Sequence, residues 1–221
     1  MKTTAIIVAA GSGSRFNSET PKQFFELNGK PVVVHSIERF EAAASVDWIV
    51  LVLPQERVNG FNTSQFAKVH IVLAGGNTRA NSVLNGLNAV PNDTAIVAVH
   101  DGARPLVTVD EIERAIDKGK QTGAACLVAP VTDTIKSIRR EEIAATLDRS
   151  QLRRALTPQV FRIEVLKKAF EEFTLDESVT DECYLVERLG RPIAMVEGSS
   201  RNIKITHSDD LLLAEALMKS K

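Results

Sequence analysis

The chain has 221 residues, 44% of them hydrophobic, and its 27 basic and 28 acidic side chains leave a formal net charge of −1. A chain of this length can bury a large core as one domain, so the composition excludes intrinsic disorder and small disulfide scaffolds. The balanced charge provides no overall basic field that could hold nucleic acid. Any phosphate binding must therefore come from local sites.

Membrane and secreted classes are also excluded. No apolar run is longer than six residues, which is too short for a membrane span or for the core of a signal peptide. The two cysteines, Cys126 and Cys183, stand in apolar segments without other cysteines or histidines at ligand spacing. This pattern excludes a structural zinc and favours a reducing compartment, so we expect a cytoplasmic protein that binds neither membrane nor nucleic acid.

Short apolar runs rich in β-branched residues alternate with longer stretches of helical period. The predicted strands are 5–9, 48–53, 69–73, 95–99 and 124–129. Because these runs are continuous rather than alternating, both of their faces must be covered, as in a parallel sheet between two layers of helices. Helical spacing recurs over 83–90 and 163–173, and Thr108 with Glu111 forms a capping-box pattern before a third helix. The alternation predicts an α/β, doubly wound fold with a largely parallel sheet, in a single domain over residues 1–221.

Residues 132–154 interrupt this alternation. They are polar, alternate weakly, and carry six arginines and lysines. The pattern predicts a β-hairpin that projects from the sheet, with a turn near 140–142. A lone hairpin is marginally stable in water, so we expect this arm to pack against a second copy of the chain. A solvated loop is the alternative.

The turn after the first strand, 9–15, reads Ala-Ala-Gly-Ser-Gly-Ser-Arg. A glycine-rich turn at a strand's carboxyl end exposes backbone N–H groups that can cradle phosphate oxygens. Phe16 occupies the third glycine position of a dinucleotide fingerprint, and no Walker sequence follows. Arg15 and Lys22 flank the turn instead, which suits triphosphate binding and stabilisation of a phosphoryl-transfer transition state. The alternative is an ordinary strand–helix turn with solvated cations.

A second polar cluster, 100–105, directly follows another predicted strand. A carboxylate at this place can hold Mg²⁺ together with phosphate oxygens, so we assign that role to Asp101 and expect magnesium as the cofactor. Arg104 either holds phosphate or pairs with an acid. His100 is interpreted as structural, because attack by a phosphate oxygen requires no general base.

Two further segments are open to more than one interpretation. Residues 75–82 run from a strand into a helix, and they could read a nucleotide base or form a capped helix start. Lys204 stands between Ile203 and Ile205, which predicts a strand whose lysine points away from its neighbours. A solvent-facing charge at a sheet edge has the same pattern.

Together these segments resemble the 2-C-methyl-D-erythritol 4-phosphate cytidylyltransferase family over nearly the whole chain. The matching segments occur in the expected order: 9–15, 21–23, 75–82, 100–105, 133–134, 148–149, 156–159, 180–182 and 202–206. The resemblance implies a Rossmann-like nucleotidyltransferase that transfers CMP from CTP to 2-C-methyl-D-erythritol 4-phosphate and releases pyrophosphate, in isoprenoid precursor biosynthesis. It also implies Mg²⁺ and a homodimer whose arms interlock.

The resemblance assigns roles to individual residues. Arg15 and Lys22 would stabilise the transition state, and Asp101 would hold Mg²⁺. The positions that would bind CTP are Ala9, Ala10, Gly11, Gly76, Asn77, Arg79 and Ser82. The positions that would place the polyol phosphate are Thr134, Arg149, Thr180, Lys204 and Arg104. Asn77 stands where a family member can carry Asp, which leaves its contact with the base open.

Two other functions compete with this interpretation. A ribitol-5-phosphate cytidylyltransferase shares the fold, the nucleotide and the arm, but Ala10 in place of Gly and Thr180-Asp-Glu in place of Ser-Asp-Ala argue against it. A non-catalytic nucleotide-binding regulatory module is disfavoured because a mere binder does not need both Arg15 and Lys22. Pyrophosphate release from CTP, Mg²⁺ and a panel of polyol phosphates would separate these possibilities.

Overall fold

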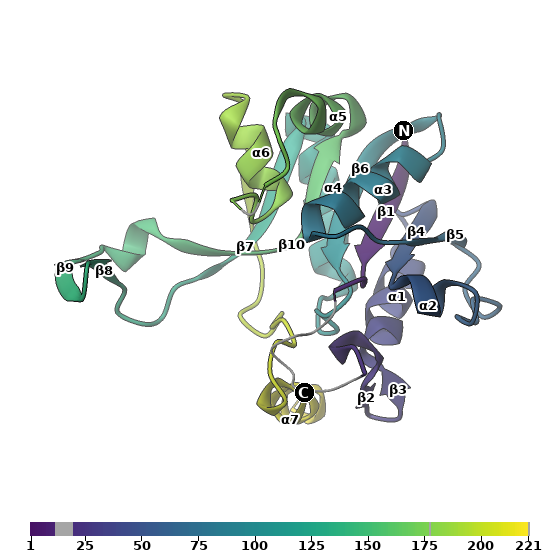
Figure 1. Cartoon of the computed structure of the whole chain (residues 1–221), viewed down its shortest axis with the longest axis horizontal. Coiled ribbons are helices and arrows are strands. Elements are labelled where there is room, and N and C mark those ends of the chain that lie inside the picture. The colour runs from purple at the N-terminus through teal and green to yellow at the C-terminus, as the bar shows by residue number, and fades with distance from the viewer. Residues whose placement is uncertain (12–19, 177, 221) are drawn as a thin grey trace.

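The computed structural model describes residues 1–11, 20–176 and 178–220 (Figure 1). Its main element is a seven-stranded sheet. In chain order its strands are β1 (Lys2–Val8), β4 (Trp48–Leu53), β5 (Val69–Ala74), β6 (Thr94–Asp101), β7 (Ala124–Pro130), β10 (Arg153–Arg162) and β11 (Ala194–Glu197). In space they are ordered β11-β7-β10-β6-β1-β4-β5. Strand β10 runs antiparallel to its neighbours β6 and β7, and the other pairings in this sheet are parallel.

Helices cover both faces of the sheet, as predicted. They are α1 (Val32–Ala42), α2 (Gln55–Val58), α3 (Arg79–Ala89), α4 (Val109–Thr122), α5 (Ile163–Glu172), α6 (Glu182–Arg188) and α7 (Asp209–Lys219). Alternate residues of β1 divide between two cores: Ile7 packs with α1 and α4, and Ile6 packs with α3. Because both faces of β1 are buried, its apolar run is continuous. The doubly wound α/β prediction is confirmed.

The strand order reverses at β1, where β4 and β5 lie on one side and β6 lies on the other. In doubly wound sheets the crevice for a ligand opens at such a reversal, beyond the carboxyl ends of the strands. The register pairs Val8 with Asp101, the last residues of β1 and β6. The turn that begins at Ala9 therefore lies next to the Asp101 cluster.

The predicted hairpin is present as β8 (Lys136–Arg139) and β9 (Glu142–Thr146), which projects away from the sheet (Figure 1). Ile138 and Ile143 are register partners, and their side chains are 73% and 68% exposed. The last two residues of the predicted arm, 132–154, overlap the start of β10. Arg153 and Arg154 already belong to β10, where they pair with residues 130 and 129 of β7.

Two of the polar motif segments take different places in the fold. Residues 157–159 lie in β10 within the sheet, and Thr157 and Gln159 are buried. The prediction that Lys204 lies in a strand is wrong, because residues 201–206 form a loop between β11 and α7. This loop packs beside the small antiparallel pair β2 (Glu26–Leu27) and β3 (Lys30–Pro31), in a cluster that includes Leu27, Ile205 and Ala214 of α7. None of the helices in the described ranges has the length and apolar character needed to cross a lipid bilayer.

Candidate active site

A cavity of about 430 Å³ opens at the carboxyl ends of β1, β5 and β6. Ten of the residues singled out in the sequence line it: Ala9, Ala10, Gly11, Lys22, Gly76, Asn77, Arg79, Ser82, Asp101 and Lys204. These residues come from five separate segments of the chain. The structure therefore brings most of the predicted site together at the crevice where the strand order reverses.

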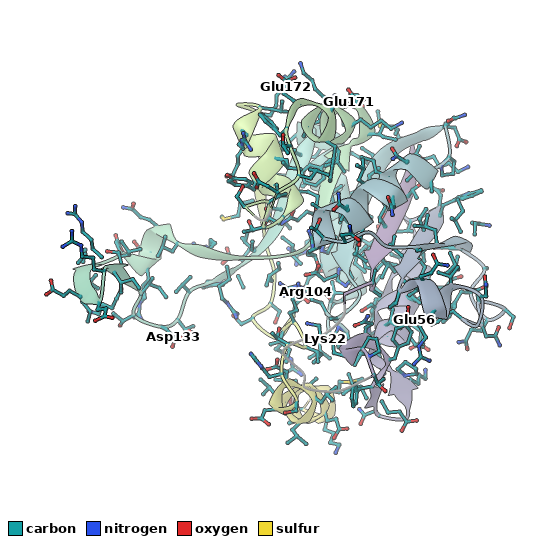
Figure 2. The ribbon with its side chains drawn as sticks, viewed as in Figure 1. Lys22, Glu56, Arg104, Asp133, Glu171 and Glu172 are labelled. Atoms are coloured by element: carbon teal, nitrogen blue, oxygen red, sulfur yellow. The ribbon has the colours of Figure 1, made fainter. Side chains whose placement is uncertain are left out.

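Five predicted residues are not among those that line the cavity. Arg15 lies outside the described residues. Thr134 and Arg149 are exposed on the arm, where the Arg149 guanidinium donates a hydrogen bond to the carbonyl of Thr132; Figure 2 marks the neighbouring Asp133 far from Lys22. Thr180 is exposed just before α6. The Arg104 guanidinium donates to the carbonyl of Asn202.

Gln23 fixes the turn that follows β1. It lies in the short 3-10 helix η2 (Lys22–Phe24), and its side chain is buried. Its Nε2 donates to the carbonyl oxygens of Ala9, at 2.5 Å, and Gly11, at 3.0 Å. The same helix carries Lys22 to the wall of the cavity. The 21–23 motif contains Gln23 but does not indicate its role, because the residues that accept its hydrogen bonds are 12 and 14 positions away in the chain.

The turn after β5 is held by its own side chains. The Ser82 hydroxyl accepts from the Gly76 N–H at 3.1 Å and donates to the Thr78 carbonyl at 2.9 Å. Thr78 caps α3 by accepting from the Asn81 N–H. Gly76 and Asn77 nevertheless face the cavity. The helix start is therefore capped and also presents a polar turn to the cavity, so the two interpretations of this segment do not exclude each other.

Asp101 is the centre of an ionic cluster. Its Oδ1 accepts from Nε of Arg79 at 2.9 Å, and its Oδ2 lies 2.9 Å from Nζ of Lys204 and 3.4 Å from Nε of Arg104. Burial opposes ionisation of this carboxyl, but the three cations hold its pKa well below the ordinary value. Asp101 is therefore a carboxylate at the cavity wall.

Arg79 connects Asp101 to a second carboxylate that sequence reasoning missed. Its Nη1 and Nη2 lie 2.6 Å and 3.1 Å from the two carboxylate oxygens of Glu182. Glu182 opens α6 and is completely buried, and this burial raises its pKa even though Arg79 acts in the opposite direction. The motif 180–182 had marked the segment, but the pairing spans 103 residues and leaves no local signal.

Arg104 and His100 support the cluster from behind. Arg104 pairs with Asp101 and donates to the carbonyl of Asn202 at 2.9 Å, so of its two predicted roles the structure shows the acid pairing. The buried imidazole of His100 meets the Thr157 hydroxyl at 2.9 Å and the Arg104 carbonyl at 3.3 Å. Burial lowers the pKa of His100 to about 3, so the ring is neutral. This supports its interpretation as structural.

Asp101 is the carboxylate in this cavity that would take part in holding a magnesium ion. Within the described ranges no group of three or more His, Cys, Asp or Glu side chains could hold a metal by itself. Mg²⁺ in nucleotide sites is commonly bound through one or two carboxylates and the phosphate oxygens. Asp101 would supply one carboxylate to such an ion, and Lys204, whose side chain is 34% exposed, would then have to leave Oδ2.

Comparisons with known proteins agree with this arrangement. Residues 3–220 match the family model of 2-C-methyl-D-erythritol 4-phosphate cytidylyltransferase (IspD). An enzyme of that name from Syntrophus aciditrophicus is 42% identical over 227 residues, covering 100% of this chain and 97% of its own. The solved structure of the Francisella tularensis enzyme is 33% identical, with a TM-score of 0.83 over 98% of this chain and 99% of that one. A solved 4-diphosphocytidyl-2C-methyl-D-erythritol synthase from Anaerococcus prevotii is 25% identical, with a TM-score of 0.86 over 99% and 98%. The chain belongs to the 2-C-methyl-D-erythritol 4-phosphate cytidylyltransferase family.

Proposed function

We propose that the cavity at the ends of β1, β5 and β6 is where this chain binds CTP and 2-C-methyl-D-erythritol 4-phosphate. The chain transfers CMP from CTP to that phosphate, forming 4-diphosphocytidyl-2-C-methyl-D-erythritol and pyrophosphate in isoprenoid precursor biosynthesis. The observation that carries the assignment of the site is the convergence of ten motif residues from five segments on one cavity.

CTP lies along the turns that follow β1 and β5. The backbone of Ala9, Ala10 and Gly11 cradles the nucleotide, and Gly76, Asn77 and Ser82 hold the cytidine. Arg79 contributes through its contact with Asp101. Backbone N–H groups at such a turn suit phosphate oxygens because they need no counter-ion of their own. The lining residues in this part of the cavity are small or polar, which supports the assignment.

The reaction is an in-line attack by a phosphate oxygen of the polyol phosphate on the α-phosphorus of CTP. The new bond joins that oxygen to the α-phosphorus, and the bond to the β-phosphate oxygen breaks, so pyrophosphate leaves with the electron pair. Both reactants are anions, and their repulsion is the main barrier that the site must lower. Arg15 and Lys22 stabilise the charge on the reacting phosphate, and Lys204 turns from Asp101 toward the incoming phosphate.

Asp101 would hold Mg²⁺, which supplies positive charge to the triphosphate when it is bound. His100 moves no proton, because the attacking oxygen is already ionised and the ring is fixed between Thr157 and Arg104. Arg104 keeps Asp101 and the 201–206 loop in place through its bonds to both, so its effect on the polyol phosphate is indirect.

The arm joins two copies of the chain and completes each site. Thr134, Arg149 and Thr180 are exposed and stand outside the cavity of their own chain, although the family resemblance assigns them to the polyol phosphate. The exposed Ile138 and Ile143 give the hairpin an apolar patch that a second arm can cover.

Both cysteines are buried and unoxidised, which supports a cytoplasmic location.

Pyrophosphate release with CTP, Mg²⁺ and a panel of polyol phosphates tests this function. We expect turnover with 2-C-methyl-D-erythritol 4-phosphate, and little with ribitol 5-phosphate or when UTP or ATP replaces CTP. A preference for ribitol 5-phosphate would reassign the substrate. Equal turnover with CTP and UTP would remove the cytosine selectivity assigned to 76–82, and no release with any acceptor would leave only a nucleotide-binding module.

A further inference from the structure

Arg79 spans two carboxylates of different accessibility. Its Nε donates to Asp101 on the cavity side, while Nη1 and Nη2 both donate to Glu182. The Glu182 side chain has no exposed area, whereas those of Asp101 and Arg79 are 9% and 26% exposed. The cavity therefore ends in a row of alternating charges that runs from Lys204 through Asp101 and Arg79 to Glu182.

Glu182 is not the residue that caps the start of α6. Asp181 already caps this helix by accepting from the Tyr184 N–H at 2.9 Å, and it also accepts from Gln159 at 2.8 Å. Among the described residues, Arg79 donates both of the hydrogen bonds that the Glu182 carboxylate accepts. A fully buried charge is costly unless it is paired. The Glu182 carboxylate is paired with the Arg79 guanidinium, which it holds in place.

The orientation of Arg79 determines which of the two carboxylate oxygens of Asp101 it contacts. With its terminal nitrogens on Glu182, the guanidinium reaches only Oδ1 of Asp101, and Oδ2 is contacted by Lys204 and, at the longer distance of 3.4 Å, by Arg104. A guanidinium released from Glu182 could instead form the two parallel hydrogen bonds that arginine makes with carboxylates. It would then cover both oxygens of Asp101.

We propose that Glu182 is a positioning residue for the transfer reaction: by holding both terminal nitrogens of Arg79, it keeps Arg79 off Oδ2 of Asp101, so that the cation accompanying the nucleotide has only Lys204 to displace and the long Arg104 contact to share. This inference rests on the proposed function. Glu182 touches no substrate, and its influence passes through Arg79 alone. The prediction is therefore a loss that depends on magnesium, rather than a general loss of nucleotide affinity.

The experiment compares Glu182→Gln with wild type, using CTP as the ligand in calorimetry with Mg²⁺ or with EDTA, together with pyrophosphate release. Glutamine keeps the size of the side chain but removes the charge that holds Arg79. We expect CTP affinity to fall about tenfold or more with Mg²⁺ and less than twofold with EDTA, and the Mg²⁺ concentration for half-maximal turnover to rise. Glu182→Asp keeps the charge, so its CTP affinity with Mg²⁺ should lie between those of wild type and Glu182→Gln.

Glu111→Gln is the matched control for loss of a buried carboxylate. Glu111 is almost as deeply buried, but it belongs to the capping box of α4 and accepts from the N–H groups of Thr108 and Ser199. The Glu111→Gln variant should have a lower melting temperature, but the ratio of its CTP affinities with and without Mg²⁺ should equal that of wild type. Equal losses for Glu182→Gln in Mg²⁺ and in EDTA, or no loss in either, would overturn the proposal.

A double variant keeps the test decisive if Glu182→Gln does not fold. Arg79→Gln with Glu182→Gln removes the buried charge together with its counter-ion, which proteins tolerate better than losing one partner. If Glu182 acts only through Arg79, the double variant binds CTP with Mg²⁺ no more weakly than Arg79→Gln alone. A further loss overturns the proposal. A wild type that binds CTP but releases no pyrophosphate refutes the proposed function, while the affinity ratios still decide the role of Glu182.

Discussion

A Cβ atom placed on Gly75 would lie 2.2 Å from the Cβ of Ala10, so the turns that follow β5 and β1 meet where only glycine fits. The same atom would lie 2.7 Å from the Ser82 hydroxyl oxygen. The Ala10 methyl is fixed by its backbone and cannot rotate away. Both turns line the cavity, so their contact sets the spacing between the two walls that we assign to the nucleotide.

Gly75→Ala should therefore push the two turns apart. We expect it to lower the free energy of unfolding by about 2 kcal/mol, the usual scale for overpacking a tight contact, and to weaken CTP binding. Gly60→Ala is the matched control, because a Cβ there meets nothing within 4 Å. Thermal unfolding and CTP titration of both variants measure the effect. Equal melting temperatures would show that the turns can adapt to the extra methyl group.

The sequence motifs predicted which segments form the cavity, but they did not predict the contacts between those segments. Gly75 and Ala10 were both marked by their glycine-rich turns, but their approach depends on the order of β1, β4 and β5 in the sheet. Glu182 and Gln23 act through partners far away in the chain, which local patterns cannot reveal. The site was thus predictable as a set of segments and not as a network.

Lys204 shows why a local pattern failed, and Thr157 shows how the sheet accommodates a polar residue. Ile205 is buried because it packs under α7 and its N–H donates to the Ala103 carbonyl at 2.8 Å, and this loop burial imitates the period of a strand. Thr157 is a polar residue in the sheet interior, where it is buried. Its hydroxyl accepts from the Asp101 N–H at 3.1 Å and meets His100, so the polar group is satisfied inside the core.

His100 should make stability depend on pH. Burial lowers the pKa of His100 from 6.5 to about 3, so between these values the unfolded chain binds a proton that the native state does not. The contribution of the neutral ring is complete above pH 6.5 and is lost as the pH falls, by about 1 kcal/mol per pH unit. Urea unfolding at pH 7, 6 and 5 measures this loss. His100→Gln should be less stable at pH 7, and its deficit should shrink toward pH 5; parallel curves would contradict the assignment.

Lys22→Ala should abolish most of the activity without unfolding the protein. Lys22 lines the cavity on a short 3-10 helix rather than in either main core, so we expect little change in melting temperature. Loss of one preorganised charge at the reacting phosphate should lower kcat about 100-fold or more. Lys30→Ala is the control, since Lys30 pairs with Glu38 outside the cavity. A folded Lys22→Ala variant with normal turnover would remove this residue from the mechanism.

The last prediction concerns the arm, which is expected to deliver Arg149 to the site of the partner subunit. Arg149 is exposed and is not among the residues that line the cavity of its own chain, whereas Lys204 does line that cavity and contacts Asp101. In a two-fold dimer each arm would donate the same residue to the other copy. Arg149→Ala and Lys204→Ala should each be inactive by themselves, because each removes a cation from every site.

Mixing these two inactive variants under conditions of subunit exchange separates the two assignments. In a mixed dimer, the Arg149→Ala subunit keeps its own Lys204 and receives an intact Arg149 from its partner, so one of the two sites is whole. Random exchange of equal amounts makes half of the dimers mixed, and we expect about a quarter of wild-type pyrophosphate release. If both residues acted within one subunit, every site in the mixture would lack a cation and no activity would return. Failure to recover activity, with mixed dimers detected by native mass spectrometry, would mean that the arm does not complete the neighbouring site.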